Sequence, residues 1–192
     1  MYNIAIDGPA GSGKSTVAGM LSEKLDILYL DTGAMYRACA LKAMRLGIDP
    51  ADEQAVSSFI DNVNIEVGYE GGVQHTYLDG EDVSKKIREN HMSEKSSQIS
   101  RHACVRTKMV SLQREIASKS SCVLDGRDIC LHVLPNAKYK FYLSASPEVR
   151  AKRRWSELHD RGTDYSYERL LEEIKSRDYA DSHRANSPLE IA

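Results

Sequence analysis

The segment Gly8-Pro-Ala-Gly-Ser-Gly-Lys-Ser-Thr16 constrains this chain more strongly than any other part of its sequence. It fits the phosphate-binding pattern G-x-x-x-x-G-K-[ST] and directly follows a short apolar run, residues 2–6. Glycines allow such a loop to curl until its backbone N–H groups point at a phosphate, while Lys14 adds a positive charge and Ser15 a hydroxyl for Mg²⁺. The segment therefore predicts a strand, a P-loop and a helix in that order. The alternative is a glycine-rich turn without a ligand.

The chain is expected to be helical from Lys14 onward, because Val17, Met20, Leu21 and Leu25 recur at helical spacing. The N-terminus of this helix would face the bound phosphates. We expect Lys14 itself to be exposed in the protein without ligand, with little to pack against.

Strand and helix signals alternate along the chain, which is typical of a parallel sheet flanked by helices. The apolar run at residues 27–30 predicts a second buried strand, and a helix is expected over residues 34–46. Residues 122–125 and 139–143 predict two further core strands. The expected fold class is therefore α/β, with a P-loop and a central parallel sheet flanked by helices.

The pattern changes after residue 63, where a helix expected from Glu53 ends. Residues 64–67 and 73–78 alternate around Glu70-Gly-Gly72, which indicates an antiparallel hairpin. We interpret this part as a small β lobe inserted between helices of the core. Further helical segments are expected at residues 83–89, 93–100, 105–116, 147–162 and 166 to about 181.

Composition narrows the class of protein. The 192 residues are 41% hydrophobic and 28% charged, which suits one well-buried core with a lid or insert. A net charge of −2 argues against a surface for nucleic acid, so small anions are the expected partners. Absence of a membrane-length apolar run predicts a soluble, cytoplasmic protein, which we expect to be a monomer. The cysteines form no C-x-x-C pair and are expected to be reduced packing residues: Cys39, Cys104, Cys122 and Cys130.

Asp125 ends a predicted buried strand, where P-loop proteins keep an acid near the Mg²⁺ water shell. Arg127 and Asp128 follow it, just beyond the carboxyl end of the strand, where open α/β sheets bind ligands. A turn carboxylate and a structural Arg–Asp pair are the alternative interpretations.

Arginines form two groups that suit phosphate. Arg150, Arg153 and Arg154 share one helix face, where like charges repel by a few tenths of a kcal/mol per pair, and a bound triphosphate would reverse this. A solvated helix face is the alternative. The other group comes from separate elements: Arg37, Arg106, Arg127, Arg177 and Arg184.

Several segments together closely resemble the bacterial cytidylate kinase family. The P-loop alone would suit many proteins, whereas the other segments distinguish this family from adenylate, thymidylate and shikimate kinases. The resemblance covers essentially the whole chain and is carried by residues 4–16, 30–37, 78–83, 124–129, 144–154 and 174–184.

The resemblance implies transfer of the ATP γ-phosphoryl group to CMP or dCMP, with Mg²⁺, giving ADP and the cytidine diphosphate. The residues implied to bind ATP are Gly8, Pro9, Ala10, Gly11, Ser12, Gly13, Lys14, Ser15, Thr16 and Arg150, with Ser15 also at the metal. The CMP phosphate is assigned to Thr32, Arg37, Arg127 and Arg184, the ribose to Arg177 and Asp181, and cytosine to Ser97, Arg106 and Asp128. The residues implied in phosphoryl transfer are Lys14, Asp125, Arg127, Arg153 and Arg154.

The resemblance also implies a P-loop kinase fold, in which a central parallel sheet flanked by helices carries a small antiparallel β insert in the nucleotide-binding region and a helical lid. A core at residues 1–60, 105–146 and 162–192 would carry a nucleotide-binding insert at about 61–104 and a lid at about 147–162. The chain stops where the family continues to another strand and a helix, about 25 to 35 residues by analogy. We therefore expect residues 139–143 to be an exposed sheet edge. After Asp128-Ile129 the chain also departs from the family pattern, with Cys130-Leu131-His132 in place of glycine and small or β-branched residues.

Two alternatives remain at this point. One is a kinase of another nucleoside monophosphate, such as UMP. The other is a nucleotide-binding switch that phosphorylates no second substrate. A GTPase should carry an N-K-x-D motif, which this sequence lacks, and the second arginine group argues against a simple sensor.

Overall fold

The computed structural model describes residues 1–89, 91–160 and 162–192, and its centre is a four-stranded parallel sheet. The strand order is β2-β6-β1-β7, which confirms the predicted parallel α/β core. A second, antiparallel sheet has the order β3-β4-β5. The strands are β1 (Asn3–Asp7), β2 (Leu28–Asp31), β3 (Ile65–Glu70), β4 (Val73–Leu78), β5 (Glu81–Asp82), β6 (Cys122–Gly126) and β7 (Tyr139–Tyr142).

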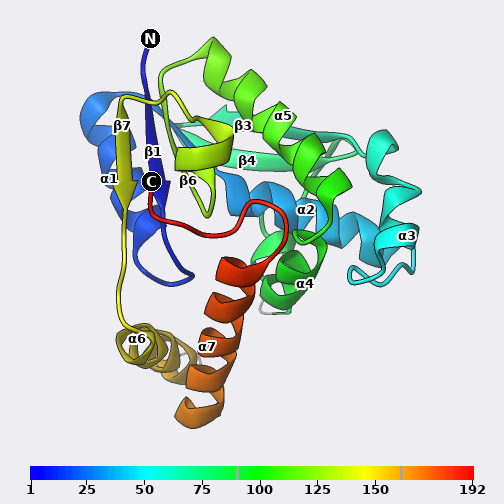
Figure 1. Cartoon of the computed structure of the whole chain (residues 1–192), viewed down its shortest axis with the longest axis vertical. Coiled ribbons are helices and arrows are strands. Elements are labelled where there is room, and N and C mark those ends of the chain that lie inside the picture. Colours follow the sequence, from blue (N-terminus) through cyan, green and yellow to red (C-terminus); the bar gives the residue numbers. More distant parts are fainter. Residues whose placement is uncertain (90, 161) are drawn as a thin grey trace.

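Helices surround the parallel sheet, and two of them lie beyond its carboxyl end (Figure 1). The α-helices are α1 (Lys14–Leu25), α2 (Thr32–Arg45), α3 (Glu53–Ser57), α4 (Met92–Ile99), α5 (Ala103–Lys119), α6 (Pro147–Asp160) and α7 (Tyr167–His183). Short 3₁₀ turns are η1 (Ile60–Asn62) and η2 (Lys86–Arg88), and η3 (Ile129–Val133) is a π-helix.

Alternation along β1 divides the core into two layers. Ala5 belongs to the larger cluster, which α2 and α5 line, whereas Ile4 and Ile6 belong to a smaller cluster with Ala18 of α1. Successive side chains of a strand point to opposite faces, so a central strand needs apolar residues at every position. This explains why the strand reads as a continuous apolar run.

Two apolar residues of α1 whose helical spacing suggests burial are exposed to solvent instead. Met20 is 64% exposed and Leu25 43%, while Ala18 is fully buried. The loop before the helix fixes its orientation, because Gly13 in the left-handed region directly precedes Lys14. A small residue then allows close approach to the sheet.

Two predicted helices are shorter than expected. The helix from Glu53 ends at Ser57 instead of continuing to residue 63, and residues 83–89 form only the η2 turn. Ser57 and Ser58 each donate a side-chain hydrogen bond to the carbonyl three residues earlier, at 2.7 Å. Such bonds offer the backbone an alternative to the helix, which explains the early end of α3.

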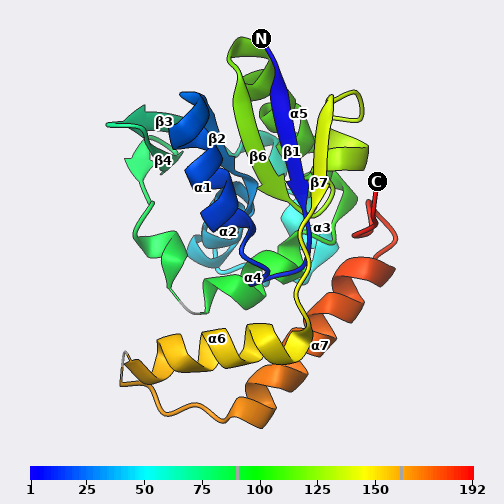
Figure 2. The ribbon, with the colours of Figure 1, turned by 90° about the vertical axis from the view of Figure 1, so that its left-hand side faces the viewer.

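The predicted hairpin is confirmed, with Ile65 opposite Leu78 and Glu70 opposite Val73. Gln74 attaches this sheet to the core by accepting a hydrogen bond from the Asp31 backbone N–H at 2.7 Å. Figure 2 shows the hairpin beside the parallel sheet, with α6 and α7 together below it.

β7 is an edge strand of the parallel sheet, as expected, and Phe141 on it is 52% exposed. All four cysteines are free, which agrees with the sequence analysis. Within the described residues, no helix is long and apolar enough to cross a membrane.

Candidate active site

Three strands of the parallel sheet carry an aspartate at or next to their carboxyl ends. Asp7 ends β1 and Asp31 ends β2, while Asp125 lies next to the end of β6. The register places Asp125 beside both Asp31 and Ile6, so the carboxylates meet at one edge of the sheet. The P-loop begins directly after Asp7 at this same edge.

Lys14 is buried rather than exposed, which corrects the expectation from the sequence. Its side chain lies under the loop, and Nζ donates a hydrogen bond to the Pro9 carbonyl at 2.7 Å. Burial and the nearby Arg127 guanidinium lower the pKa of Lys14 to about 7, although Asp125 and Asp7 oppose the shift. A phosphate bound in the loop would add a negative charge close to Lys14 and so favour its protonated form.

Asp125 links the P-loop to the sheet. Its carboxylate accepts hydrogen bonds from the Ser15 hydroxyl at 2.9 Å and the Tyr29 hydroxyl at 3.0 Å. Burial, reinforced by the Asp31 charge, raises the pKa of Asp125. Within the described residues, no group of three His, Cys, Asp or Glu side chains could hold a metal ion alone. A hydroxyl paired with a carboxylate still suits Mg²⁺, which prefers oxygen ligands and keeps several waters.

Asp31 organises the start of α2 and the neighbouring cations. It accepts the Ala34 N–H as the helix N-cap and forms ion pairs with Arg37 and Arg88, each at 2.8 Å. Burial opposes the charged form, but the two arginines hold the pKa of Asp31 below its ordinary value. Thr32, the next residue, donates its hydroxyl to the Asp125 carbonyl at 2.7 Å.

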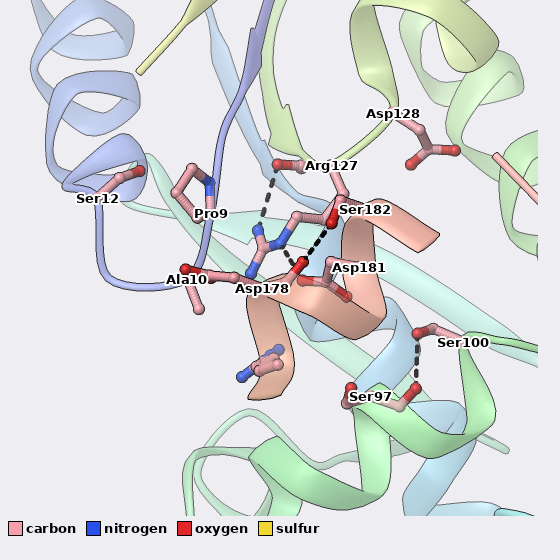
Figure 3. Close-up of polar contacts among 12 residues, drawn as sticks. Pro9, Ala10, Ser12, Ser97, Ser100, Arg127, Asp128, Asp178, Asp181 and Ser182 are labelled. Atoms are coloured by element: carbon pink, nitrogen blue, oxygen red, sulfur yellow. Dashed lines mark hydrogen bonds and ion pairs between the residues drawn. The ribbon is translucent and has the colours of Figure 1, made fainter. Parts of the chain in front are cut away.

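Arg127 extends from the end of β6 to α7, where its Nε donates to the Asp181 carboxylate at 3.0 Å (Figure 3). Arg177 lies one turn earlier on α7 and donates to the Ser93 hydroxyl at 2.6 Å. Burial and the Arg127 charge lower the pKa of Arg177 to about 10. Because α7 continues to His183, Arg177 and Asp181 share one helix face, as the spacing requires.

Asp128 lies between two arginines from different parts of the chain. Its carboxylate accepts a hydrogen bond from Arg106, and Arg184 approaches it at 3.9 Å. Both arginine side chains are about 5% exposed, and buried nitrogens of each lack a hydrogen-bond partner: Arg106 Nε and Arg184 Nη2. Tyr36 is buried beside this cluster, and its hydroxyl also lacks a hydrogen-bond partner. Buried polar atoms without partners are rare and expensive, so this cluster resembles a site built for a polar ligand.

The three arginines of α6 have different surroundings. Arg150 is buried and pairs with Asp178 of α7, whereas Arg153 is exposed and Arg154 pairs with Glu157 at 3.3 Å. Arg150 bonds to the P-loop, through the Ala10 carbonyl at 3.0 Å. Ser97 lies half-buried on α4, which Figure 3 places below α7.

Sequence reasoning missed several side chains that position the site. The Asp7 carboxylate accepts the backbone N–H groups of Ile129 and Cys130, at 2.9 and 2.8 Å, and so fixes the segment that follows Asp128. The segment Cys130-Leu131-His132, where the sequence departs from the family pattern, lies within η3. A signal for Asp7 was available, since a carboxylate at the end of an apolar strand is costly to bury without partners.

Asp31 is also a carboxylate at the end of an apolar strand, so its role could have been predicted, whereas Tyr29 and Asp178 gave no such signal. Tyr29 lies in an apolar run and Asp178 in a charged helix, so neither stands out by residue type. Their partners are distant in sequence, and only the fold brings them together.

A P-loop at the carboxyl edge of a parallel sheet, with Arg127 after β6 and Arg177 on α7 nearby, defines a P-loop nucleotide-binding protein. The additional arginines suit a second anionic ligand. A family model described as cytidylate kinase matches residues 4–192. The chain belongs to the cytidylate kinase family, whose members are phosphotransferases.

Curated relatives agree with this assignment. A cytidylate kinase of Caldicellulosiruptor bescii is 45% identical over 99% of this chain and 84% of that protein. One from Bacillus pumilus is 47% identical with the same coverage. A third, from Caldanaerobacter subterraneus subsp. tengcongensis, is 50% identical over 98% of this chain and 82% of that protein.

Proposed function

We propose that the chain transfers the γ-phosphoryl group of ATP to CMP and dCMP, giving ADP and the corresponding diphosphate. The observation that carries this proposal is the position of Arg127. It directly follows the β6 strand, whose Asp125 bonds to Ser15 of the P-loop, and it bonds to Asp181 of α7. A donor phosphate on the loop and an acceptor phosphate at Arg127 would therefore be neighbours.

The ATP side of the site is proposed to be the loop from Gly8 to Thr16 together with Arg150. Inward backbone N–H groups and Lys14 would hold the phosphates. Ser15 and Asp125 would hold Mg²⁺, Ser15 directly or through water, and the ion would supply charge neutralisation at the phosphates.

The CMP side is proposed from the family pattern and from the cluster described above. Its phosphate would contact Thr32, Arg37, Arg127 and Arg184, its ribose Arg177 and Asp181, and its base Ser97, Arg106 and Asp128. Arg106 Nε and Arg184 Nη2 lack hydrogen-bond partners, which supports this assignment because a polar ligand would supply them.

Phosphoryl transfer needs positioning and charge stabilisation more than covalent chemistry by the protein. Lys14 and Arg127 would balance charge on the transferring group, with Arg153 and Arg154 joining when the lid at about 147–162 closes and excludes water. Residue 161 of that range, and residue 90 of the insert at about 61–104, lie outside the described residues. The insert at about 61–104 would close over CMP, since Arg88 and Gln74 already contact Asp31.

We also propose that the protein acts as a monomer in the cytoplasm on small nucleotides, without nucleic acid or membrane partners. Four free cysteines suit a reducing compartment, and the net charge of −2 suits small ligands better than a polyanion.

A coupled assay of ADP release over CMP, dCMP, UMP and AMP tests the function. We expect kcat/KM to be highest for the cytidine nucleotides, and Lys14→Ala to remove several kcal/mol of transition-state stabilisation, roughly 3 to 5. A preference for UMP would favour the alternative that the protein is a kinase of another nucleoside monophosphate. ATP binding without transfer to any monophosphate would favour the nucleotide switch.

A further inference from the structure

Arg150 of α6 is almost completely enclosed, and three separate parts of the chain accept its hydrogen bonds. Its Nε donates to the Ala145 carbonyl at 2.8 Å, and Nη1 donates to the Ala10 carbonyl at 3.0 Å. Nη1 and Nη2 also form a bidentate ion pair with the Asp178 carboxylate, in which Nη1 lies 3.0 Å from Oδ1. Only 2% of the Arg150 side chain is exposed.

The contact between Arg150 and Ala10 satisfies a backbone carbonyl of the P-loop. A loop that turns its N–H groups inward to a phosphate turns carbonyls outward, and those carbonyls need donors. Lys14 satisfies the Pro9 carbonyl, and Arg150 satisfies the next one, Ala10. The Arg150 side chain also packs along the loop, since a Cβ at Gly11 would lie 3.7 Å from Arg150 Cβ.

Asp178 fixes the guanidinium in this position from the other side. A bidentate ion pair with a carboxylate fixes the plane of the guanidinium as well as its distance from the carboxylate. Asp178 belongs to α7, and Figure 3 shows it beside Ala10. An arginine that lost this partner could rotate away from the loop or leave a buried charge unpaired, and either result would loosen the Ala10 contact.

We propose that Asp178 is a positioning residue for the ATP site, acting through Arg150 to hold the P-loop in its phosphate-binding shape. The inference rests on the proposed binding of ATP to this loop. Asp178 touches no substrate in this scheme, although it neighbours Arg177, which belongs to the proposed CMP site. The expected result is therefore a selective loss of ATP affinity.

The test is direct binding of a fluorescent, non-hydrolysable ATP analogue to Asp178→Asn, with CMP binding measured separately by calorimetry. We expect the Kd for the analogue to rise about tenfold, as expected when a positioning contact is lost, and the Kd for CMP to stay within about twofold. Glu172→Gln is the matched control, because it removes one negative charge from an exposed position of the same helix. Asp178→Glu keeps the charge and should recover much of the affinity.

A double-mutant cycle with Arg150→Met separates positioning from general stability. Once Arg150 is removed, Asp178→Asn should cause no further loss of analogue binding, since the two changes act on one pair. Equal losses for the analogue and CMP, or a lower Tm with unchanged Kd for the analogue, would overturn the proposal. If the wild-type protein binds the analogue but phosphorylates no monophosphate, the proposed function fails while this test of Asp178 stands.

Discussion

Lys14 gives the site a pH dependence that can be measured. Its pKa in the free protein is about 7, lowered by burial and by Arg127, and bound phosphates should raise it. Above pH 7 the lysine must therefore gain a proton when ATP binds, and ATP affinity should fall as pH rises through and above that value. Below about pH 6 the lysine is charged in both states, so this contribution disappears.

Calorimetric titration at pH 8, in buffers that differ in ionisation enthalpy, measures the proton uptake. We expect the wild-type protein to take up more protons than Lys14→Met, which has no group to titrate at this position. The same uptake by both proteins would show that Lys14 does not change its protonation. Comparing the two proteins removes the contribution of the ATP phosphates themselves.

Asp128 is the residue at which we expect base specificity to be decided. As a carboxylate it can accept from the amino group of cytosine but would face a carbonyl oxygen of uracil. That mismatch should cost about 1–3 kcal/mol, so Asp128→Asn should narrow the gap in kcat/KM between CMP and UMP. An unchanged ratio would remove Asp128 from base recognition, and thermal unfolding will show whether the Arg106 pair has been lost as well.

At the scale of elements, the turn from β1 into the P-loop demands glycine at position 8. Gly8 has φ +148°, and an added Cβ would lie 2.0 Å from the Leu143 carbonyl oxygen of the neighbouring chain segment. We expect Gly8→Ala to lower the free energy of unfolding by at least about 2 kcal/mol and to abolish ATP binding.

Gly19 provides the control on the helix that follows. It lies within α1, where an added Cβ would meet no atom within 4 Å. Gly19→Ala should raise stability by roughly 0.5–1 kcal/mol, since glycine is unfavourable inside a helix. Chemical denaturation of both variants makes the comparison, and similar destabilisation by the two would contradict the steric argument.

The order of strands and helices was predictable because each long element carries its own pattern. The P-loop, the hairpin around Gly71 and Gly72, and the continuous apolar strands all depend on neighbouring residues. The helix end at Ser57 was not predicted, because it depends on local side-chain hydrogen bonds that compete with the helix.

At the scale of the whole molecule, the site concentrates cations that repel one another when no ligand is bound. Burial and Arg127 lower the pKa of both Lys14 and Arg177, and burial with Arg106 lowers that of Arg184. A ligand phosphate would relieve this repulsion, so the phosphate of CMP should contribute most of the stabilisation by ligand.

Thermal unfolding with CMP and with cytidine tests this expectation. At about 100 times its Kd, CMP should stabilise the fold by about 2.7 kcal/mol, which corresponds to about 5–10 °C in Tm for a chain of this size. Cytidine at the same concentration should shift Tm by less than about 1 °C. Equal shifts would indicate that the base, rather than the cation cluster, dominates binding.

The sequence predicted which residue types form the candidate site, but not which side chains contact one another there. Sequence placed Lys14, Asp125 and Arg127 near one sheet edge, because parallel strands end together. It could not show that Lys14 is buried, since that depends on how the P-loop folds over the side chain. Nor could it show that Asp178 pairs with Arg150, since that depends on how α6 and α7 pack beyond the sheet.

The pairing of β1 with β6 has a consequence for synthesis on the ribosome. Asn3 pairs with Cys122, so β1 emerges first but gains this partner only after more than half of the chain has been made. At about 5–20 residues per second, that delay is on the order of ten seconds. During this time the loop after β1 has no sheet to hold it. The phosphate-binding shape of this loop therefore depends on β6 and β7, two strands that the ribosome makes late.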